Sequence, residues 1–271
     1  SIIYQMRIQK KFIKYIKKNY SFWIKVVAVL VIAYGIKLYF FKRELFPFPE
    51  YNFSELTEEQ YNNLINSNHP VLFKNTLKFN IEWKDFCKKL SNKKLKVRTG
   101  DYGTVTGRRE RKFKNEKLGK ICDEIHLSNQ YGGNNIITRE EQNKINLVSS
   151  NPNINIFRTG KLWIGPSNSR TPLHKDQPKN LAIQIYGEKK WQLFDKKDND
   201  KLCFNKNNSK LEWSRYSINN YLTCPTAFFA KKYEIIMKSG DMLYLPKQWA
   251  HDVENKSKSI MINYWNKPIY F

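Results

Sequence analysis

Three kinds of hydrophobic pattern divide the chain: a long apolar segment near the N-terminus, helical spacing after it, and short runs in the second half. The long segment, 21–41, reads SFWIKVVAVLVIAYGIKLYFF and has 21 residues. A helix of that length rises about 31 Å, close to the thickness of a bilayer's hydrocarbon core. Aromatic residues at both of its ends are typical of the membrane interface. The pattern predicts a transmembrane helix over 21–41, and hence a membrane as one partner.

Two lysines interrupt this segment. Lys25 and Lys37 each lie close to an end, where their side chains can extend toward the interface. The uninterrupted apolar run 26–36 has 11 residues, which also fits a buried helix of a soluble protein. The preceding segment 1–20 is basic, so the positive-inside rule predicts a single-pass protein with its N-terminus in the cytosol or matrix. We expect the mitochondrial inner membrane or an endomembrane, since segment 1–20 also resembles a presequence remnant.

The segment 44–98 predicts a helix, a strand and a second helix that lead into the main domain. Two prolines indicate a linker at its start. Ser54 or Thr57 can cap a helix in which the apolar residues recur at helical spacing. The segment 69–75, HPVLFKN, reads as a strand, and 81–90, IEWKDFCKKL, reads as an amphipathic helix.

The rest of the chain divides into a basic, variable region over 99–153 and a β-rich core over 154–271. Within the first, the charged run 108–117 is expected to be a solvated loop or, alternatively, a contact for phosphate groups. In the core, short strand-like runs are separated by Gly, Pro, Asn and Asp. Such runs fit a barrel or sandwich, so the chain is predicted to be mainly β with N-terminal helices.

Positive charge is in excess along the whole chain. The formal net charge is +24, and residues 1–43 contain ten Lys or Arg and no acidic residue. Such an excess favours anionic partners, such as nucleic acid, acidic lipids or acidic protein surfaces. A compositional bias toward Lys and Asn would give the same excess without a functional reason.

The cysteines give no clear sign of a metal site. They form no CxxC pair and no Cys/His spacing of a zinc site. Buried or free thiols are therefore expected, although two disulfides also remain compatible with the sequence. The four residues are Cys87, Cys122, Cys203 and Cys224.

Three residues of the core have the composition of an iron(II) site. Iron(II) that binds both a chelating cosubstrate and dioxygen needs three protein ligands on one face, and two imidazoles with one carboxylate supply them. His174 and Asp176 are one residue apart, so in a strand both side chains project to the same side. His251 would come from a later strand. The alternative is a chance His-x-Asp pair on a surface turn.

A lysine after the first two ligands suggests the cosubstrate. If a turn precedes the strand that begins at Lys189, then Lys189, Trp191 and Leu193 share its inward face. A buried lysine is costly without a partner. The distal carboxylate of 2-oxoglutarate would be that partner, with Thr171 donating a further hydrogen bond. A register shifted by one residue would instead put Lys189 in solvent.

Near the end of the core, the run SIMINYW gives Met261, Asn263 and Trp265 a common face. Asn263 is then an inward polar group that needs a hydrogen-bond partner. A contact with the metal-bound end of the cosubstrate would satisfy it.

These segments, TPLHKD, 180–194, GDMLYLPKQWAH and INYW, resemble the cupin-like branch of the JmjC dioxygenases, which includes an asparaginyl hydroxylase. The resemblance is specific over 162–265 and weaker over 51–90. It implies a double-stranded β-helix (cupin or jelly roll) that hydroxylates a protein side chain while 2-oxoglutarate is decarboxylated to succinate. It implies Fe(II) on His174, Asp176 and His251, and 2-oxoglutarate held by Thr171, Asn180, Lys189 and Asn263.

Two departures from the family leave the function open. The tyrosine-containing segment of the family's pocket is not found between 100 and 150. The chain ends at Phe271, without the C-terminal helices through which the asparaginyl hydroxylase dimerises, so that homodimer is not expected. Three functions therefore compete: a membrane-anchored hydroxylase of a protein side chain, an accessory and inactive cupin subunit of a large membrane complex such as a mitochondrial one, and an RNA-modifying hydroxylase.

Overall fold

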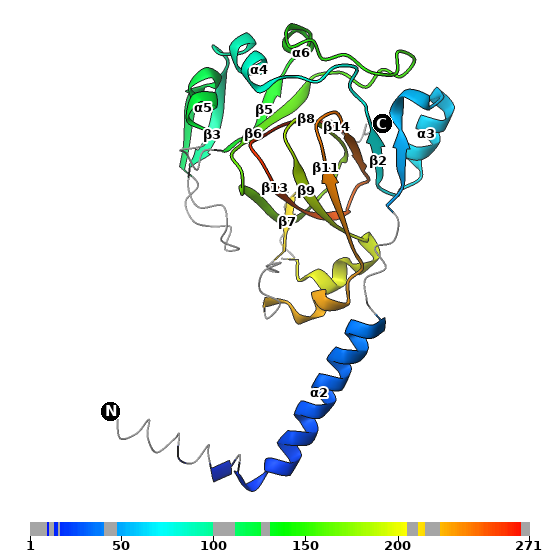
Figure 1. Cartoon of the computed structure of the whole chain (residues 1–271), viewed down its shortest axis with the longest axis vertical. Coiled ribbons are helices and arrows are strands. Elements are labelled where there is room, and N and C mark those ends of the chain that lie inside the picture. Colours follow the sequence, from blue (N-terminus) through cyan, green and yellow to red (C-terminus); the bar gives the residue numbers. More distant parts are fainter. Residues whose placement is uncertain are drawn as a thin grey trace. The chain divides into compact units, whose positions relative to one another are not determined.

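The computed structural model describes residues 10, 14–15, 17–40, 48–99, 112–125, 131–204, 211–214 and 223–266 of the 271. The chain divides into two compact units, Ser1–Pro47 and Phe48–Phe271. In the first unit the described residues form chiefly the helix α2 (Tyr20–Phe40) (Figure 1). Most of the basic segment 1–20 lies outside the described residues.

Helix α2 forms where the apolar pattern begins, but the membrane prediction is wrong. Among the residues that the structure describes, no helix is both long enough and apolar enough to cross a membrane. Lys25 and Lys37 limit the uninterrupted apolar run to 11 residues. Such a run rises about 17 Å as a helix, roughly half the thickness of the hydrocarbon core. The predicted transmembrane helix is therefore corrected, and with it the predicted single-pass location in the mitochondrial inner membrane or an endomembrane.

In the described part of the second unit, two β-sheets form the framework (Figure 1). The larger sheet has the strand order β1 (Glu50–Asn52), β2 (Val71–Lys74), β12 (Met242–Leu245), β8 (Lys179–Tyr186), β14 (Ser259–Asn266), β6 (Gly160–Gly165), β5 (Tyr131–Ile137), β3 (Lys94–Thr99) and β4 (Lys112–Lys117). The smaller sheet has the order β10 (Leu211–Trp213), β7 (Arg170–Asp176), β13 (Ala250–Asn255), β9 (Lys189–Phe194) and β11 (Lys232–Met237).

The two sheets share an apolar core that joins their inner faces. Ala182 and Leu243 of the larger sheet belong to the same buried cluster as Leu193 and Ile235 of the smaller sheet. Two sheets packed in this way form a sandwich whose interior is lined by alternate residues of each strand. The prediction of a mainly β, cupin-like fold with some helices is confirmed.

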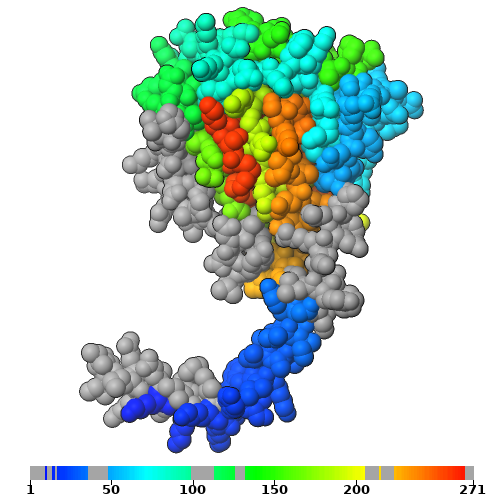
Figure 2. All heavy atoms as spheres, in the orientation of Figure 1, coloured from blue at the N-terminus to red at the C-terminus, as the bar shows by residue number. Residues whose placement is uncertain are grey.

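The outer face of the larger sheet is covered by a second core under the helices α3 (Glu58–Asn66), α4 (Trp83–Lys89), α5 (Leu118–Glu124) and α6 (Arg139–Lys144). Figure 2 shows the cyan and green segments that carry α4, α5 and α6 gathered on one side of the yellow to red strands. Strand β14 illustrates the alternation: Ile260 and Ile262 belong to this outer core, whereas Met261 belongs to the inner one. Burial on both faces fixes the register of β14, because a shift by one residue would exchange the two sets.

The lead-in elements form where the sequence predicts them. Thr57 caps α3 in a capping box, in which its Oγ1 accepts from the backbone N–H of Gln60 while the Gln60 side chain accepts from the Thr57 N–H. Strand β2 lies within 69–75 and α4 within 81–90. The charged run 108–117 differs from the prediction, because its described part, Lys112–Lys117, pairs with β3 as strand β4 instead of forming a loop.

All four cysteines are paired, so the expectation of thiols is wrong. One disulfide joins Cys87 of α4 to Cys122 of α5. The other joins Cys203 to Cys224, which flank the short helices η2 (Lys196–Leu202) and η4 (Pro225–Phe229). Because the partners are 35 and 21 residues apart in sequence, only the fold brings their Cα atoms to 6.1 and 6.0 Å. By loop closure each would stabilise the folded state by about 3 to 4 kcal/mol.

Candidate metal centre and its pocket

The three predicted metal ligands meet in the smaller sheet. His174 and Asp176 lie on β7, and His251 lies opposite His174 on the neighbouring antiparallel strand β13. One ligand atom from each of the three residues lies within 4.8 Å of the others. The centroids of the two imidazole rings are 4.2 Å apart, and His251 Nε2 lies 3.9 Å from Asp176 Oδ2. The structure thus brings together on one site the residues that the sequence motif suggested.

Backbone carbonyls orient both imidazoles for metal binding. Nδ1 of His174 lies 2.8 Å from the carbonyl oxygen of Pro172, and Nδ1 of His251 lies 3.0 Å from that of Trp249. A carbonyl oxygen only accepts, so each Nδ1 carries the proton and each Nε2 keeps its lone pair. Burial, helped by the nearby His251, holds the pKa of His174 well below its ordinary value. His174 is therefore neutral, the form that binds a metal.

The carboxyl group of Asp176 completes the donor set. It is 9% exposed, and burial raises its pKa above the ordinary value while the neighbouring His251 opposes that rise. A divalent cation beside the carboxylate would compensate the cost of burying its charge. Two imidazole nitrogens and one carboxylate oxygen on one side of a site are the donor set of non-haem iron(II). The residues present therefore fit a mononuclear iron(II).

A cavity of about 120 Å³ adjoins the three ligands. Strands of both sheets line it, so the pocket lies in the interior of the sandwich. Of the residues predicted to hold the cosubstrate, Thr171, Asn180 and Asn263 line this cavity. Its other lining residues are Arg98, Asn134, Trp163, Trp191, Val253, Met261 and Trp265.

Two asparagines form a buried polar pair in the cavity. Asn263 Nδ2 donates a hydrogen bond of 2.8 Å to Asn180 Oδ1. The two side chains are 3% and 2% exposed. Asn263 shares the inward face of β14 with Met261 and Trp265, as predicted. Its Oδ1 is buried without a hydrogen-bond partner among the described residues, which leaves an acceptor for a bound ligand.

Lys189 is buried on the inward face of β9, as the alternation predicted, with 1% of its surface exposed. Its Nζ donates to Oδ1 of Asn255, whose own amide group donates to Pro166 O and Ser169 Oγ. Burial lowers the pKa of Lys189 to about 7. Lys189 is absent from the cavity lining; it lies two residues from Trp191 on one face of β9, a separation of about 7 Å.

Three tryptophans form the aromatic part of the lining, and one of them packs on His251. The indole of Trp191 stacks on the imidazole of His251, with ring centroids 5.6 Å apart and planes inclined by 27°. Trp163 and Trp265 meet edge to face at 6.4 Å on the larger sheet. These rings make the pocket largely apolar around its few polar groups, as is usual for ligand sites.

Arg98 and Asn134 are pocket residues that sequence reasoning missed. They come from β3 and β5, in the region where no family motif was found. The alternation of apolar and polar residues in KLKVRT could have indicated Arg98. Leu95 and Val97 are buried in the outer core, so Arg98 projects from the other face of the strand. What the pattern could not give is that β3 extends the larger sheet toward the ligands.

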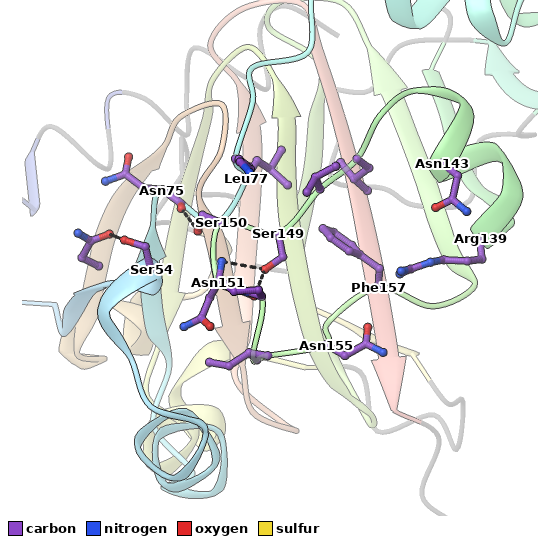
Figure 3. Close-up of a pocket in the computed structure, with 16 residues that line it drawn as sticks. Ser54, Asn75, Leu77, Arg139, Asn143, Ser149, Ser150, Asn151, Asn155 and Phe157 are labelled. Carbon is purple, nitrogen blue, oxygen red and sulfur yellow. Dashed lines mark hydrogen bonds between the residues drawn. The ribbon is translucent and has the colours of Figure 1, made fainter.

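A larger cavity, of about 720 Å³, lies elsewhere on the second unit (Figure 3). Among the described residues, no Asp, Glu, His or Cys lines it. Several of its polar side chains bind backbone carbonyls: Asn151 Nδ2 donates to the carbonyls of Phe53 and Leu56, and Ser150 Oγ donates to that of Asn75. These bonds join the lead-in to the segment before β6, so we assign this cavity a structural role.

Known proteins similar to this chain include several with a JmjC domain. Jumonji C domain-containing protein 5 of Drosophila melanogaster is 29% identical over 110 residues, which cover 39% of this chain and 27% of the relative. JmjC domain-containing protein C of Dictyostelium discoideum is 36% identical over 121 residues, 40% of this chain and 28% of the relative. Lysine-specific demethylase JMJ30 of Arabidopsis thaliana is 29% identical over 105 residues, 38% of this chain and 24% of the relative.

The alignments thus span about a quarter of the length of these curated relatives. The family match is far more extensive, because residues 55–270 match the family described as Cupin-like domain. That range contains both sheets except β1, the three metal ligands and the whole pocket lining. The chain therefore belongs to the cupin-like JmjC family.

Proposed function

We propose that this chain is an iron(II)- and 2-oxoglutarate-dependent hydroxylase that acts on a protein side chain. The observation that carries the proposal is the ligand set, in which His174, Asp176 and His251 each offer one ligand atom within 4.8 Å of the others. A purely structural cupin has no need of such a set. When bound, iron(II) would let dioxygen act as the oxidant: one oxygen atom enters succinate as 2-oxoglutarate loses CO2, and the other replaces a substrate C–H bond by C–OH.

The chain's own residues hold and orient the reactants. His174, Asp176 and His251 would hold iron(II) and leave coordination positions open for cosubstrate and dioxygen. Near them, the Asn263 amide offers a buried acceptor, and its donor is already committed to Asn180. This pair would fix the orientation of a ligand's polar group beside the metal.

Lys189 would hold the distal carboxylate of 2-oxoglutarate together with Thr171. An anionic group beside the buried ammonium would offset the cost of burial that lowers the pKa of Lys189 to about 7. Thr171 pairs with Val253 across β7 and β13 and lines the cavity between the ligands and Lys189's end of the sheet. The tryptophan rings around the cavity would exclude bulk water during the reaction.

The direct test is turnover of the cosubstrate. Purified protein with iron(II), ascorbate and 2-oxoglutarate is expected to form succinate, and Asp176→Asn is expected to abolish that product. Asp123→Asn, which removes an exposed carboxylate of α5, is the matched control and should keep the wild-type rate. Absence of both metal binding and succinate in the wild-type protein would contradict the proposal.

A further inference from the structure

Arg98 is a cation in the pocket that has no role in the proposed binding of iron or of 2-oxoglutarate. It projects from β3 into the cavity that His174 and Asp176 also line. Its Nε is buried and has no hydrogen-bond partner among the described residues. A buried guanidinium donor without a partner costs free energy, so its retention points to a ligand that completes it.

The position of Arg98 is well defined. Asn135 of β5 accepts from the backbone N–H of Lys96 at 2.7 Å and donates to the Lys96 carbonyl at 3.1 Å, which ties β3 to β5 two residues before Arg98. Outside the cavity, the ring of Phe113 lies 5.9 Å from the guanidinium carbon. A side chain held by its strand in this way is preorganised for binding.

The charges of the described part of the site leave Arg98 uncompensated. Among the described residues that line the cavity, the Lys, Arg, Asp and Glu types are represented by Arg98 and Asp176 alone. The two positive charges of iron(II) and the one of Lys189 are balanced by Asp176 and a doubly charged 2-oxoglutarate. The charge of Arg98 is then left over in a half-buried position, where it attracts a further anion more strongly than it would in open solvent.

We infer that Arg98 selects an acidic substrate: its guanidinium pairs with the carboxylate of an Asp or Glu side chain of the protein that is hydroxylated. This inference rests on the proposed function. The guanidinium fork matches a carboxylate with two parallel hydrogen bonds, which gives orientation as well as affinity. The chain's net charge of +24 would favour the approach of an acidic segment.

The test uses pairs of synthetic peptides that differ only by Glu against Gln or Asp against Asn. Binding is measured to full-length protein loaded with manganese(II) and 2-oxoglutarate, which supports binding without turnover. The wild type is expected to bind the acidic member about tenfold or more tightly, the size expected for a charge-assisted hydrogen bond. Arg98→Gln should remove the preference, Arg98→Lys should keep part of it, and Arg98→Glu should shift it to Lys-containing peptides.

The matched control is Lys96→Gln, which makes the same change in net charge on the same strand but at an exposed position. It should keep the acidic preference. The inference is overturned if wild type shows no acidic preference, if Arg98→Gln keeps it, or if a single-stranded RNA oligomer binds in place of every peptide. It is also overturned if Arg98→Gln weakens 2-oxoglutarate binding and leaves peptide preference unchanged, because Arg98 would then serve the cosubstrate. Failure of wild type to bind metal would instead defeat the proposed function.

Discussion

The two sides of the pocket are built in different ways. On the smaller sheet, two neighbouring strands supply all three candidate metal ligands, and both histidines are held by a short local contact, such as that of His251 Nδ1 with the Trp249 carbonyl. On the larger sheet, Arg98 and Asn134 come from the strands β3 and β5 near its edge. Under our proposals, the smaller sheet holds the metal, whereas the edge strands β3 and β5 could change the substrate preference without disturbing the metal.

Removing a ligand on the smaller sheet should have the largest effect. His251→Ala is expected to abolish stoichiometric iron(II) binding, because two protein ligands do not retain a metal that three hold on one face. Equilibrium dialysis with metal analysis measures it. His69→Ala, which removes an exposed histidine, is the control. Unchanged metal content in His251→Ala would show that the metal site lies elsewhere.

The next largest effect should come from Lys189, at the far end of the same sheet. Lys189→Met is expected to weaken 2-oxoglutarate binding by about tenfold to a hundredfold, since it removes the ammonium that pairs with the carboxylate. The affinity of the wild type should also depend on pH. With a pKa of about 7 in the free protein, Lys189 is charged below pH 7, so affinity is highest there and falls as pH rises above it.

Titration calorimetry at several pH values tests both statements about Lys189. The pH dependence above 7 should disappear in Lys189→Met, while metal binding is retained. If the variant binds 2-oxoglutarate as the wild type does, the lysine has a structural role and the cosubstrate carboxylate lies elsewhere in the pocket.

Loss of a disulfide should have an effect of intermediate size. Breaking either with paired Cys→Ser substitutions should lower the free energy of unfolding by about 3 to 4 kcal/mol. The effects on the metal should differ. Cys224 packs in a cluster with Leu173 and Ala250, which directly precede His174 and His251, whereas Cys87 and Cys122 lie in the outer core under the helices.

Loss of the Cys203–Cys224 bond should therefore weaken iron(II) binding, and loss of the Cys87–Cys122 bond should not. Chemical denaturation and metal titration of the two double variants measure this difference. Equal metal affinities in both variants would mean that the cluster around Leu173 does not support the ligands.

The smallest effect should come from the edge of the larger sheet. Asn135→Ala removes both hydrogen bonds to the backbone of Lys96 and loosens β3. We expect a reduction of about twofold to fivefold in the preference for acidic peptides, with unchanged iron(II) affinity. A loss of metal binding in this variant would contradict the separation of the two sides.

The same contrast explains what the sequence could and could not predict. His174 and Asp176 lie on β7 and Lys189 lies on β9 of the β-rich core, where alternation alone decides which side chains face inward. Arg98 also follows alternation, but its closeness to the metal depends on β3 joining the sheet beyond β5, a long-range pairing that local pattern does not contain. The disulfides were not predicted for the same reason, because Cys87 and Cys122 come together only when helices α4 and α5 pack against each other.

The membrane prediction failed for a different reason. The segment around α2 has the length and the aromatic ends of a span, and these outweighed the two lysines that shorten its apolar run. The total length of the segment was thus a poorer guide to a membrane span than the length of its uninterrupted apolar run. The hydrocarbon core requires a long apolar run.

The central claim, a mononuclear iron(II) that prepares the site for 2-oxoglutarate, is tested most directly by anaerobic titration calorimetry of the full chain. Iron(II) is expected to bind with one ion per chain, and 2-oxoglutarate is expected to bind tightly only after the metal is present. In His174→Ala both events should be lost. Binding of 2-oxoglutarate with equal affinity in the presence and absence of iron(II), or no binding of iron(II), would contradict the account.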